Sequence, residues 1–249
     1  MNTQVNVLSE RIIAHAHTFR RVVDFDPLKE KLVHLDLTEH NAELGNIDLA
    51  DTSLFESFIK KNLKAAKAKF GIGGYEEDRV LYKRSKLFSA FPSPVFSGSS
   101  VEIIEQVENR TIHLGIDIWG DEGTKIYAPL GGMVHSFAYN NNFGDYGATL
   151  ILMHQLDTVT FYTLYGHLSL EDIARVTEFQ YIVRGQVIGH FGSPEENGNW
   201  PPHLHFQVIK DMRTNKGDYP GVCTIADRKK YLSNCPDPDL VLNMMQYAQ

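Results

Sequence analysis

The chain has few cysteines, no basic excess and no long hydrophobic run, and each absence argues against a class of protein. Only Cys223 and Cys235 occur among 249 residues, so no disulfide framework is implied and we expect two reduced thiols. Lys and Arg number 24 against 31 Asp and Glu, giving a formal net charge of −7. This balance argues against a nucleic-acid partner, because phosphate binding usually needs a basic patch. No apolar run reaches the roughly 18 residues of a membrane span.

The first residues, MNTQVNVLSERIIAHAH, do not have the basic stretch and apolar core of a secretory signal peptide. As written, the sequence therefore predicts a cytoplasmic protein, or a periplasmic or extracellular one if a leader was removed. Its length suits one large domain or two modest ones. Hydrophobic content of 43% and charged content of 22% are ordinary for a globular protein.

Residues 1–97 have mixed α and β signals and are expected to form an α+β region of unknown role. Apolar positions recur at helical spacing over residues 5–19, and residues 31–37 alternate like a half-buried strand. This region could cover a groove as an inhibitory segment, extend a sheet rigidly, or bind a partner.

A capping box and a glycine cluster mark the middle of this region. Ser53 lies three residues before Glu56, which predicts a helix over about 53–69 that ends before Gly71. The sequence GIGGYEEDR at 71–79 contains clustered glycines, but a helix and not a strand precedes them. We therefore interpret it as a turn and not as a dinucleotide-binding loop.

Residues 98–249 are expected to form a mostly antiparallel β domain. The Pro-, Ser- and Gly-rich stretch 91–100 marks its beginning, and a short turn is expected at 170–176. The C-terminal tail is expected to be loop with a short helix or an extended closing segment. Short β-type runs separated by Gly, Asn and Asp turns occur at 102–107, 132–139, 148–154, 158–168, 180–191 and 203–209.

Five residues in this second part could form a catalytic metal site. His203 and His205 are two apart, so in a strand they lie on one face. His113 and Asp117 are four apart, which again places both on one face if that stretch is extended. Two histidine nitrogens and a carboxylate are the ligands expected of catalytic zinc, which keeps a position for water. If three of the five bind metal, two histidines, His167 among the candidates, remain for acid–base work.

The remaining seven histidines lack such support and are expected on the surface or in hydrogen-bonded core positions. They are His15, His17, His34, His40, His135, His154 and His190.

The order and context of these residues resemble a known family. HLGID, YGHLS, VRGQVIGHFG and PPHLHF, within roughly residues 105–210, resemble the lysostaphin/LytM-type zinc metalloendopeptidases, which are glycylglycine endopeptidases and peptidoglycan hydrolases. The resemblance implies a LytM-like antiparallel β-sheet domain of the duplicated hybrid motif type. It implies one zinc ion per chain, held by His113, Asp117 and His205, with His167 and His203 as the catalytic pair.

The implied activity is hydrolysis of peptide bonds in peptidoglycan-derived peptides, or muropeptides, by attack of zinc-bound water. Two other functions stay open: a metal-dependent amide hydrolase with an intracellular, non-wall substrate, and a non-hydrolytic LytM-like binding or regulatory module. Two segments depart from the family pattern, SPEENGNWPP at 193–202 and NNNFGDYG at 140–147. Each could form a groove wall or simply be a rigid loop.

Overall fold

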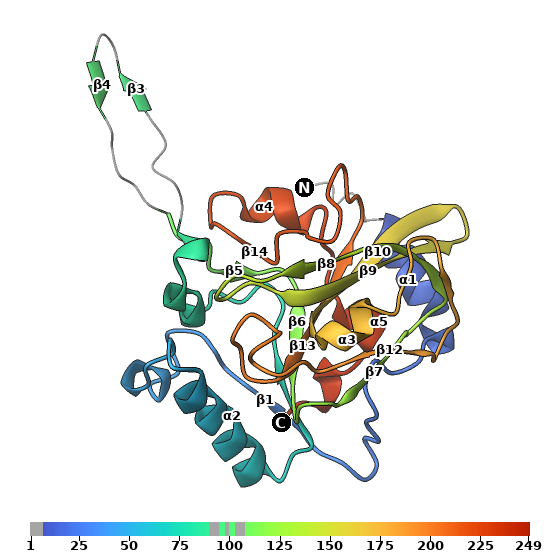
Figure 1. Cartoon of the computed structure of the whole chain (residues 1–249), viewed down its shortest axis with the longest axis horizontal. Helices are drawn as coiled ribbons and strands as arrows, with labels where there is room; N and C mark the ends of the chain where they lie inside the picture. The colour runs from blue at the N-terminus through green and yellow to red at the C-terminus, as the bar shows by residue number, and fades with distance from the viewer. Residues whose placement is uncertain (1–6, 90–94, 98–99, 103–107) are drawn as a thin grey trace.

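One eight-stranded sheet forms the centre of the computed structural model, which describes residues 7–89, 95–97, 100–102 and 108–249 (Figure 1). All neighbouring strands in it are antiparallel except the first two, which are parallel. The predicted mainly β, antiparallel fold is therefore confirmed. From edge to edge the strands are β1 (Leu32–His34), β2 (Phe70–Gly73), β6 (Ile116–Trp119), β13 (His203–Ile209), β10 (Val159–Leu168), β9 (Gly147–Leu156), β8 (Gly132–Asn140) and β11 (Tyr181–Ile182).

Shorter strands pair outside this sheet, and the helices are few. The pairs are β3 (Val95–Ser97) with β4 (Ser100–Glu102), β5 (Ile112–His113) with β14 (Val222–Cys223), and β7 (Lys125–Tyr127) with β12 (Val187–His190). The α-helices are α1 (Val7–His15), α2 (Thr52–Ala66), α3 (Leu170–Ile173), α4 (Arg228–Leu232) and α5 (Asp239–Leu242). The 3-10 helices are η1 (Ala16–Thr18), η2 (Leu44–Asn46), η3 (Val80–Arg84), η4 (Lys86–Phe88) and η5 (Met245–Tyr247).

Strand β13 is buried along its whole length, and its two faces have different chemistry. Leu204, Phe206 and Val208 belong to the largest apolar cluster. The alternate residues, His203 and His205, are polar yet only 2% and 3% exposed. Since side chains alternate across a strand, one face of β13 supports the core and the other presents the predicted site.

The helix predicted over about 53–69 is present as α2, but its predicted cap is wrong. The side chain of Asp51 accepts hydrogen bonds from the backbone N–H groups of Ser53 and Leu54. Asp51 has an extended ψ of 107°, so its carboxylate reaches the free N–H groups of the first turn. Glu56 instead forms an ion pair with Lys60 along the helix. The N-cap of the helix therefore lies two residues earlier than the capping box predicts.

The turn interpretation of residues 71–79 is wrong for its first three residues, which lie in β2. A Cβ on Gly71 would lie 2.4 Å from the side chain of Leu35, and one on Gly73 would lie 2.5 Å from Arg79. The glycines here serve close packing within a buried strand, and the turn begins only after Gly73.

Other predicted segments occur in shortened form. Residues 5–19 contain α1, residues 31–37 contain β1, and the C-terminal tail carries α4 and α5. The chain ends beside β1, where Gln249 exchanges backbone hydrogen bonds with Leu32 and His34 (Figure 1). The predicted junction at 91–100 and strand at 102–107 lie mostly outside the described residues. Within the described ranges, no helix has the length and apolar character needed to cross a membrane.

The predicted division of the chain between residues 97 and 98 stays a prediction. Strand β2 from the first part pairs with β6 from the second, with Gly73 opposite Asp117. The first part therefore extends the sheet next to the strand that carries a predicted ligand.

Candidate active site

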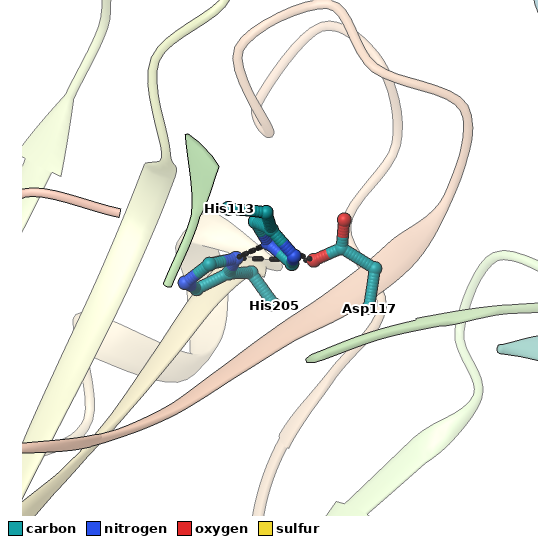
Figure 2. Close-up of side chains that lie close together, drawn as sticks. All are labelled: His113, Asp117 and His205. Atoms are coloured by element: carbon teal, nitrogen blue, oxygen red, sulfur yellow. Dashed lines mark hydrogen bonds and ion pairs between the residues drawn. The ribbon is translucent and has the colours of Figure 1, made fainter. Parts of the chain in front are cut away.

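Three of the predicted site residues meet on one side of the sheet. Strands β6 and β13 are antiparallel, and their register places Asp117 directly opposite His205. His113 lies at the end of the short strand β5, which precedes β6. Figure 2 shows the two imidazole rings and the carboxylate pointing toward one another. Gly115 permits this approach, because a Cβ there would lie 2.5 Å from the ring of His205.

The donor atoms of these three side chains form a tight triangle. His113 Nε2 lies 3.0 Å from His205 Nδ1 and 3.4 Å from Asp117 Oδ1 (Figure 2). His205 Nδ1 lies 3.0 Å from the same carboxylate oxygen. Ligand atoms about 2.0–2.2 Å from a tetrahedral zinc ion would be separated by roughly 3.3–3.5 Å. The triangle is therefore close to the size that zinc coordination requires.

The outer partners of both rings fix where the ring protons are. His113 Nδ1 lies 3.0 Å from the carbonyl oxygen of Gly74, which can only accept, so Nδ1–H donates there. His205 Nε2 lies 3.0 Å from Gln207 Oε1, while the amide nitrogen of Gln207 donates to Pro220 O. His205 Nε2–H therefore donates to Gln207. In the neutral form of each ring, the inner nitrogen then carries the lone pair.

Three potential ligand atoms therefore converge here, namely His113 Nε2, His205 Nδ1 and Asp117 Oδ1. Burial lowers the pKa of His113 to about 4, with a further contribution from the nearby Arg79, so this ring is neutral at pH 7. Lone pairs at these distances repel one another unless a cation lies among them. Two neutral imidazoles and a carboxylate are a zinc ligand set with a position to spare. The residues therefore fit a zinc ion.

The carboxylate of Asp117 stays ionised despite its burial. Burial alone would raise the pKa of Asp117, but nearby positive charge, including that of Arg79, holds it well below its usual value. Arg79 is fully buried and donates through NH1 to Asp117 Oδ2. The ionised oxygen Oδ1 is thus left to face the two histidines.

His167 and His203 form a second pair beside the first. Their ring centroids are 4.1 Å apart, and His203 stacks on the indole of Trp119 at 3.9 Å. His167 Nδ1 donates to Asn197 O and His203 Nδ1 donates to Pro201 O, each at 2.8 Å. Among the described residues neither Nε2 has a hydrogen-bond partner, so each is a free acceptor.

Both rings of this second pair are neutral. Burial lowers the pKa of His203 to about 4. Burial and then the neighbouring His203 lower the pKa of His167 well below its usual value. A neutral imidazole with one anchored N–H and one free nitrogen is suited to accept a proton.

The backbone at His167 is unusual, and it sets the direction of the ring. Its φ is 64°, within an irregularity of β10 between Tyr165 and Leu168. Left-handed backbone at a non-glycine residue is uncommon and clusters at functional sites. The bulge turns His167 away from the regular alternation of the strand and toward Asn197.

A cavity of about 140 Å³ adjoins the two groups of histidines. Both segments that depart from the family pattern contribute to it, 140–147 through Gly144, Asp145 and Tyr146 and 193–202 through Trp200. This placement favours the groove-wall interpretation of both. The part before residue 90 also supplies wall residues, namely Leu81, Tyr82, Leu87 and Phe88. The site residues that line the cavity are Asp117, His167, His203 and His205.

Sequence reasoning missed Arg79 and Trp119, which contact Asp117 and His203 respectively. Trp119 could have been found, because it lies two residues from Asp117 and so on the same face of β6. No motif marks Arg79, which reaches the site only through the pairing of β2 with β6. The other seven histidines lie where they were expected. Six are partly or fully exposed, and the buried one, His154, is hydrogen-bonded to Gly131 O and Thr163.

The sequence matches the model of Peptidase family M23 over residues 111–217, which is less than half of the chain. This range contains all five predicted site residues. Arg79 and the cavity wall before residue 90 lie outside it. No curated protein matches the sequence.

Several solved structures are similar in fold. The catalytic domain of the antimicrobial peptidase lysostaphin from Staphylococcus simulans is 21% identical, with a TM-score of 0.33, over 57% of this chain and 90% of that one. The catalytic domain of the prophage-encoded M23 protein EnpA from Enterococcus faecalis is 20% identical, with a TM-score of 0.33, over 48% of this chain and 87% of that one. A zinc-containing peptidase from Vibrio cholerae is 23% identical, with a TM-score of 0.32, over 53% of this chain and 38% of that one.

Proposed function

We propose that this chain, whose residues 111–217 match the model of Peptidase family M23, is a zinc metalloendopeptidase that cleaves peptide bonds in peptidoglycan-derived peptides. The observation that carries the proposal is the convergence of three potential ligand atoms, His113 Nε2, His205 Nδ1 and Asp117 Oδ1, beside the two neutral rings of His167 and His203. The substrate class rests on the resemblance of the sequence motifs.

His113, Asp117 and His205 would hold one zinc ion per chain. Zinc bound there would lower the pKa of a water molecule to about 7 and polarise the scissile carbonyl. His113 and His205 would present their inner nitrogens to the ion, since Gly74 O and Gln207 Oε1 accept hydrogen bonds from their other nitrogens. Partners that orient ligating histidines in this way raise their basicity.

His167 and His203 handle the proton in this proposal. Each has a free Nε2 beside the cavity and an Nδ1–H anchored on a backbone carbonyl. One of them takes up the proton released by the attacking water and returns it to the departing amine. With ring centroids 4.1 Å apart, two imidazolium charges would repel strongly, so the pair holds one proton at a time.

Trp119 limits the motion of this pair. Its indole lies 3.9 Å from the ring of His203 with an interplanar angle of 15°. The stacking keeps His203 in one orientation, which preserves the position of its Nε2 during proton transfer.

Two measurements test the proposal. The metal content of the purified protein should approach one zinc per chain, and zinc titration should restore it after chelation. Purified muropeptides should be cleaved, with mass spectrometry identifying the bond. Protein that neither retains nor binds zinc overturns the proposal.

Two further substrates separate the open alternatives. Parallel digestion of oligoglycine and small amides detects an amide hydrolase with a non-wall substrate. Zinc binding without cleavage of any of the three substrates would instead indicate a non-hydrolytic module. Cleavage of muropeptides that is abolished by chelation and restored by zinc is the result we expect.

A further inference from the structure

The segment from Gly73 to Arg79 lies outside the M23 match, yet it contacts two of the three proposed ligands. Gly73 pairs with Asp117 in the register of β2 and β6. Past β2, the chain turns and runs alongside β5. There Glu76 N donates to His113 O, and His113 N donates to Glu77 O, both at 2.9 Å.

The same segment orients the ring of His113. The carbonyl oxygen of Gly74 accepts the Nδ1–H of His113 at 3.0 Å and also a hydrogen bond from Arg79 at 3.3 Å. This carbonyl therefore links the imidazole and the guanidinium. A displacement of the segment would alter the direction of the lone pair on His113 Nε2.

Arg79 is the central residue of the segment. Its side chain is fully buried, which is rare for arginine unless its donors are paired. Nε donates to Glu77 Oε2 at 2.8 Å, NH2 to Gly74 O, and NH1 to Asp117 Oδ2. The guanidinium is planar, so these contacts fix its position relative to Asp117.

Two further features keep the guanidinium in place. A Cβ on Gly73 would lie 2.5 Å from Arg79 NH2, so only glycine leaves room there. Glu77 Oε2 accepts from Arg79 Nε at 2.8 Å, and Glu77 Oε1 lies 3.4 Å from His34 Nε2. The carboxylate of Glu77 is therefore itself held on both of its oxygens.

We propose that Arg79 is a positioning residue for the metal centre. It holds Oδ2 of Asp117 so that only Oδ1 faces His113 and His205, and this rests on the zinc site proposed above. The guanidinium acts through its shape. Its charge alone, placed this close to a cation, would oppose metal binding.

The variant that separates shape from charge is Arg79→Lys. A lysine keeps the positive charge but has no planar fork that spans Asp117, Glu77 and Gly74. We expect its zinc affinity, measured by competition with a chromogenic chelator, to fall about 10- to 100-fold. The visible absorption of the Co²⁺-substituted protein should also change, because it reports ligand geometry. Zinc affinity and a Co²⁺ spectrum equal to those of the wild type would overturn the proposal.

Arg84→Lys is the matched control. Arg84 lies five residues after Arg79, at the end of η3, and is partly buried, but it contacts no proposed metal ligand among the described residues. Its zinc affinity should equal that of the wild type. An equal loss in both variants would indicate a general loss of packing and would also overturn the proposal.

Glu77→Gln keeps the test decisive if Arg79→Lys does not fold, as judged by circular dichroism. The amide retains an acceptor but lacks the charge that holds Arg79, so we expect zinc affinity to fall about threefold to tenfold. Unchanged affinity in folded Glu77→Gln would overturn the proposal. If the wild-type protein binds neither zinc nor Co²⁺, both this inference and the proposed function are overturned. If the wild type binds zinc and the Arg79→Lys variant binds it with equal affinity, only the inference is overturned.

Discussion

The M23 match at 111–217 and the segment before residue 90 contribute to the same site in different ways. The first provides all five candidate site side chains. The second provides no proposed ligand, but it supplies Arg79 behind Asp117 and the wall residues Tyr82 and Phe88. Donor atoms and their supports therefore come from separate stretches of sequence. The family match therefore covers the candidate site side chains but not all of the residues that surround them.

The two histidine pairs differ in how their ring nitrogens are arranged. In the pair His113 and His205, the free nitrogens face each other at 3.0 Å. In the pair His167 and His203, the rings lie one over the other and each Nδ1–H is tied to a backbone carbonyl. The first arrangement, together with Asp117, could hold a metal ion, whereas the second leaves the Nε2 atom of each ring without a hydrogen-bond partner among the described residues.

The largest effect on zinc binding and hydrolysis is expected for His205→Ala, which tests the difference between the two histidine pairs. Removing one of three donors should abolish stoichiometric zinc binding and reduce hydrolysis by at least about a thousandfold, because the metal contribution is several kcal/mol. Metal analysis and muropeptide turnover give the two readouts. His40→Ala, at an exposed histidine away from the site, serves as the control. Full zinc occupancy in His205→Ala would contradict the proposal that His113 and His205 are metal ligands.

The second pair should respond differently. His167→Asn retains a residue type that tolerates the φ of 64° at this position, so folding should be preserved. Hydrolysis should fall about 10²- to 10⁴-fold through loss of a proton acceptor, while zinc stays at one per chain. Loss of zinc in this variant would show that the two pairs are not functionally distinct.

The sequence predicted which candidate side chains lie together better than it predicted the residues that pack around them, for a physical reason. Strand alternation is a local rule, so the spacing of His203 and His205 was sufficient to place both on one face. The contact between Arg79 and Asp117 depends on β2 pairing with β6, which no local pattern specifies. The glycines of β2 were misread because their role is close packing against Leu35 and Arg79, which only the tertiary structure reveals.

A more moderate effect, on substrate binding, is expected for a contact between the segment before residue 90 and the two cavity loops at 140–147 and 193–202. The guanidinium of Arg84 lies 4.3 Å from the ring centroid of Trp200 and 4.8 Å from that of Phe143, and it donates to Asn199 O at 2.8 Å. Arg84→Ala should loosen both loops and raise KM about threefold to tenfold, with little change in kcat. Steady-state kinetics on a muropeptide checks this.

The neighbouring Lys83 is exposed, so Lys83→Ala is the matched control for that loop effect and should leave KM unchanged. Zinc content should remain at the wild-type level in both variants. A wild-type KM in Arg84→Ala would mean that the groove loops keep their shape without the first region.

The smallest expected effect is on stability, and it appears only below neutral pH. It concerns a buried histidine that is not among the proposed metal ligands. His154 lies between Gly131 O and Thr163 Oγ1, and burial lowers its pKa to about 4. Since its pKa is depressed on folding, the unfolded chain binds more protons between about pH 6.5 and 4, so stability falls as the pH is lowered through that window. The loss from this group reaches about 3 kcal/mol, because each pKa unit corresponds to about 1.4 kcal/mol. Urea unfolding of the chelated protein should therefore show a shallower pH dependence in His154→Gln, and an identical pH dependence would mean that His154 is not held neutral by the fold.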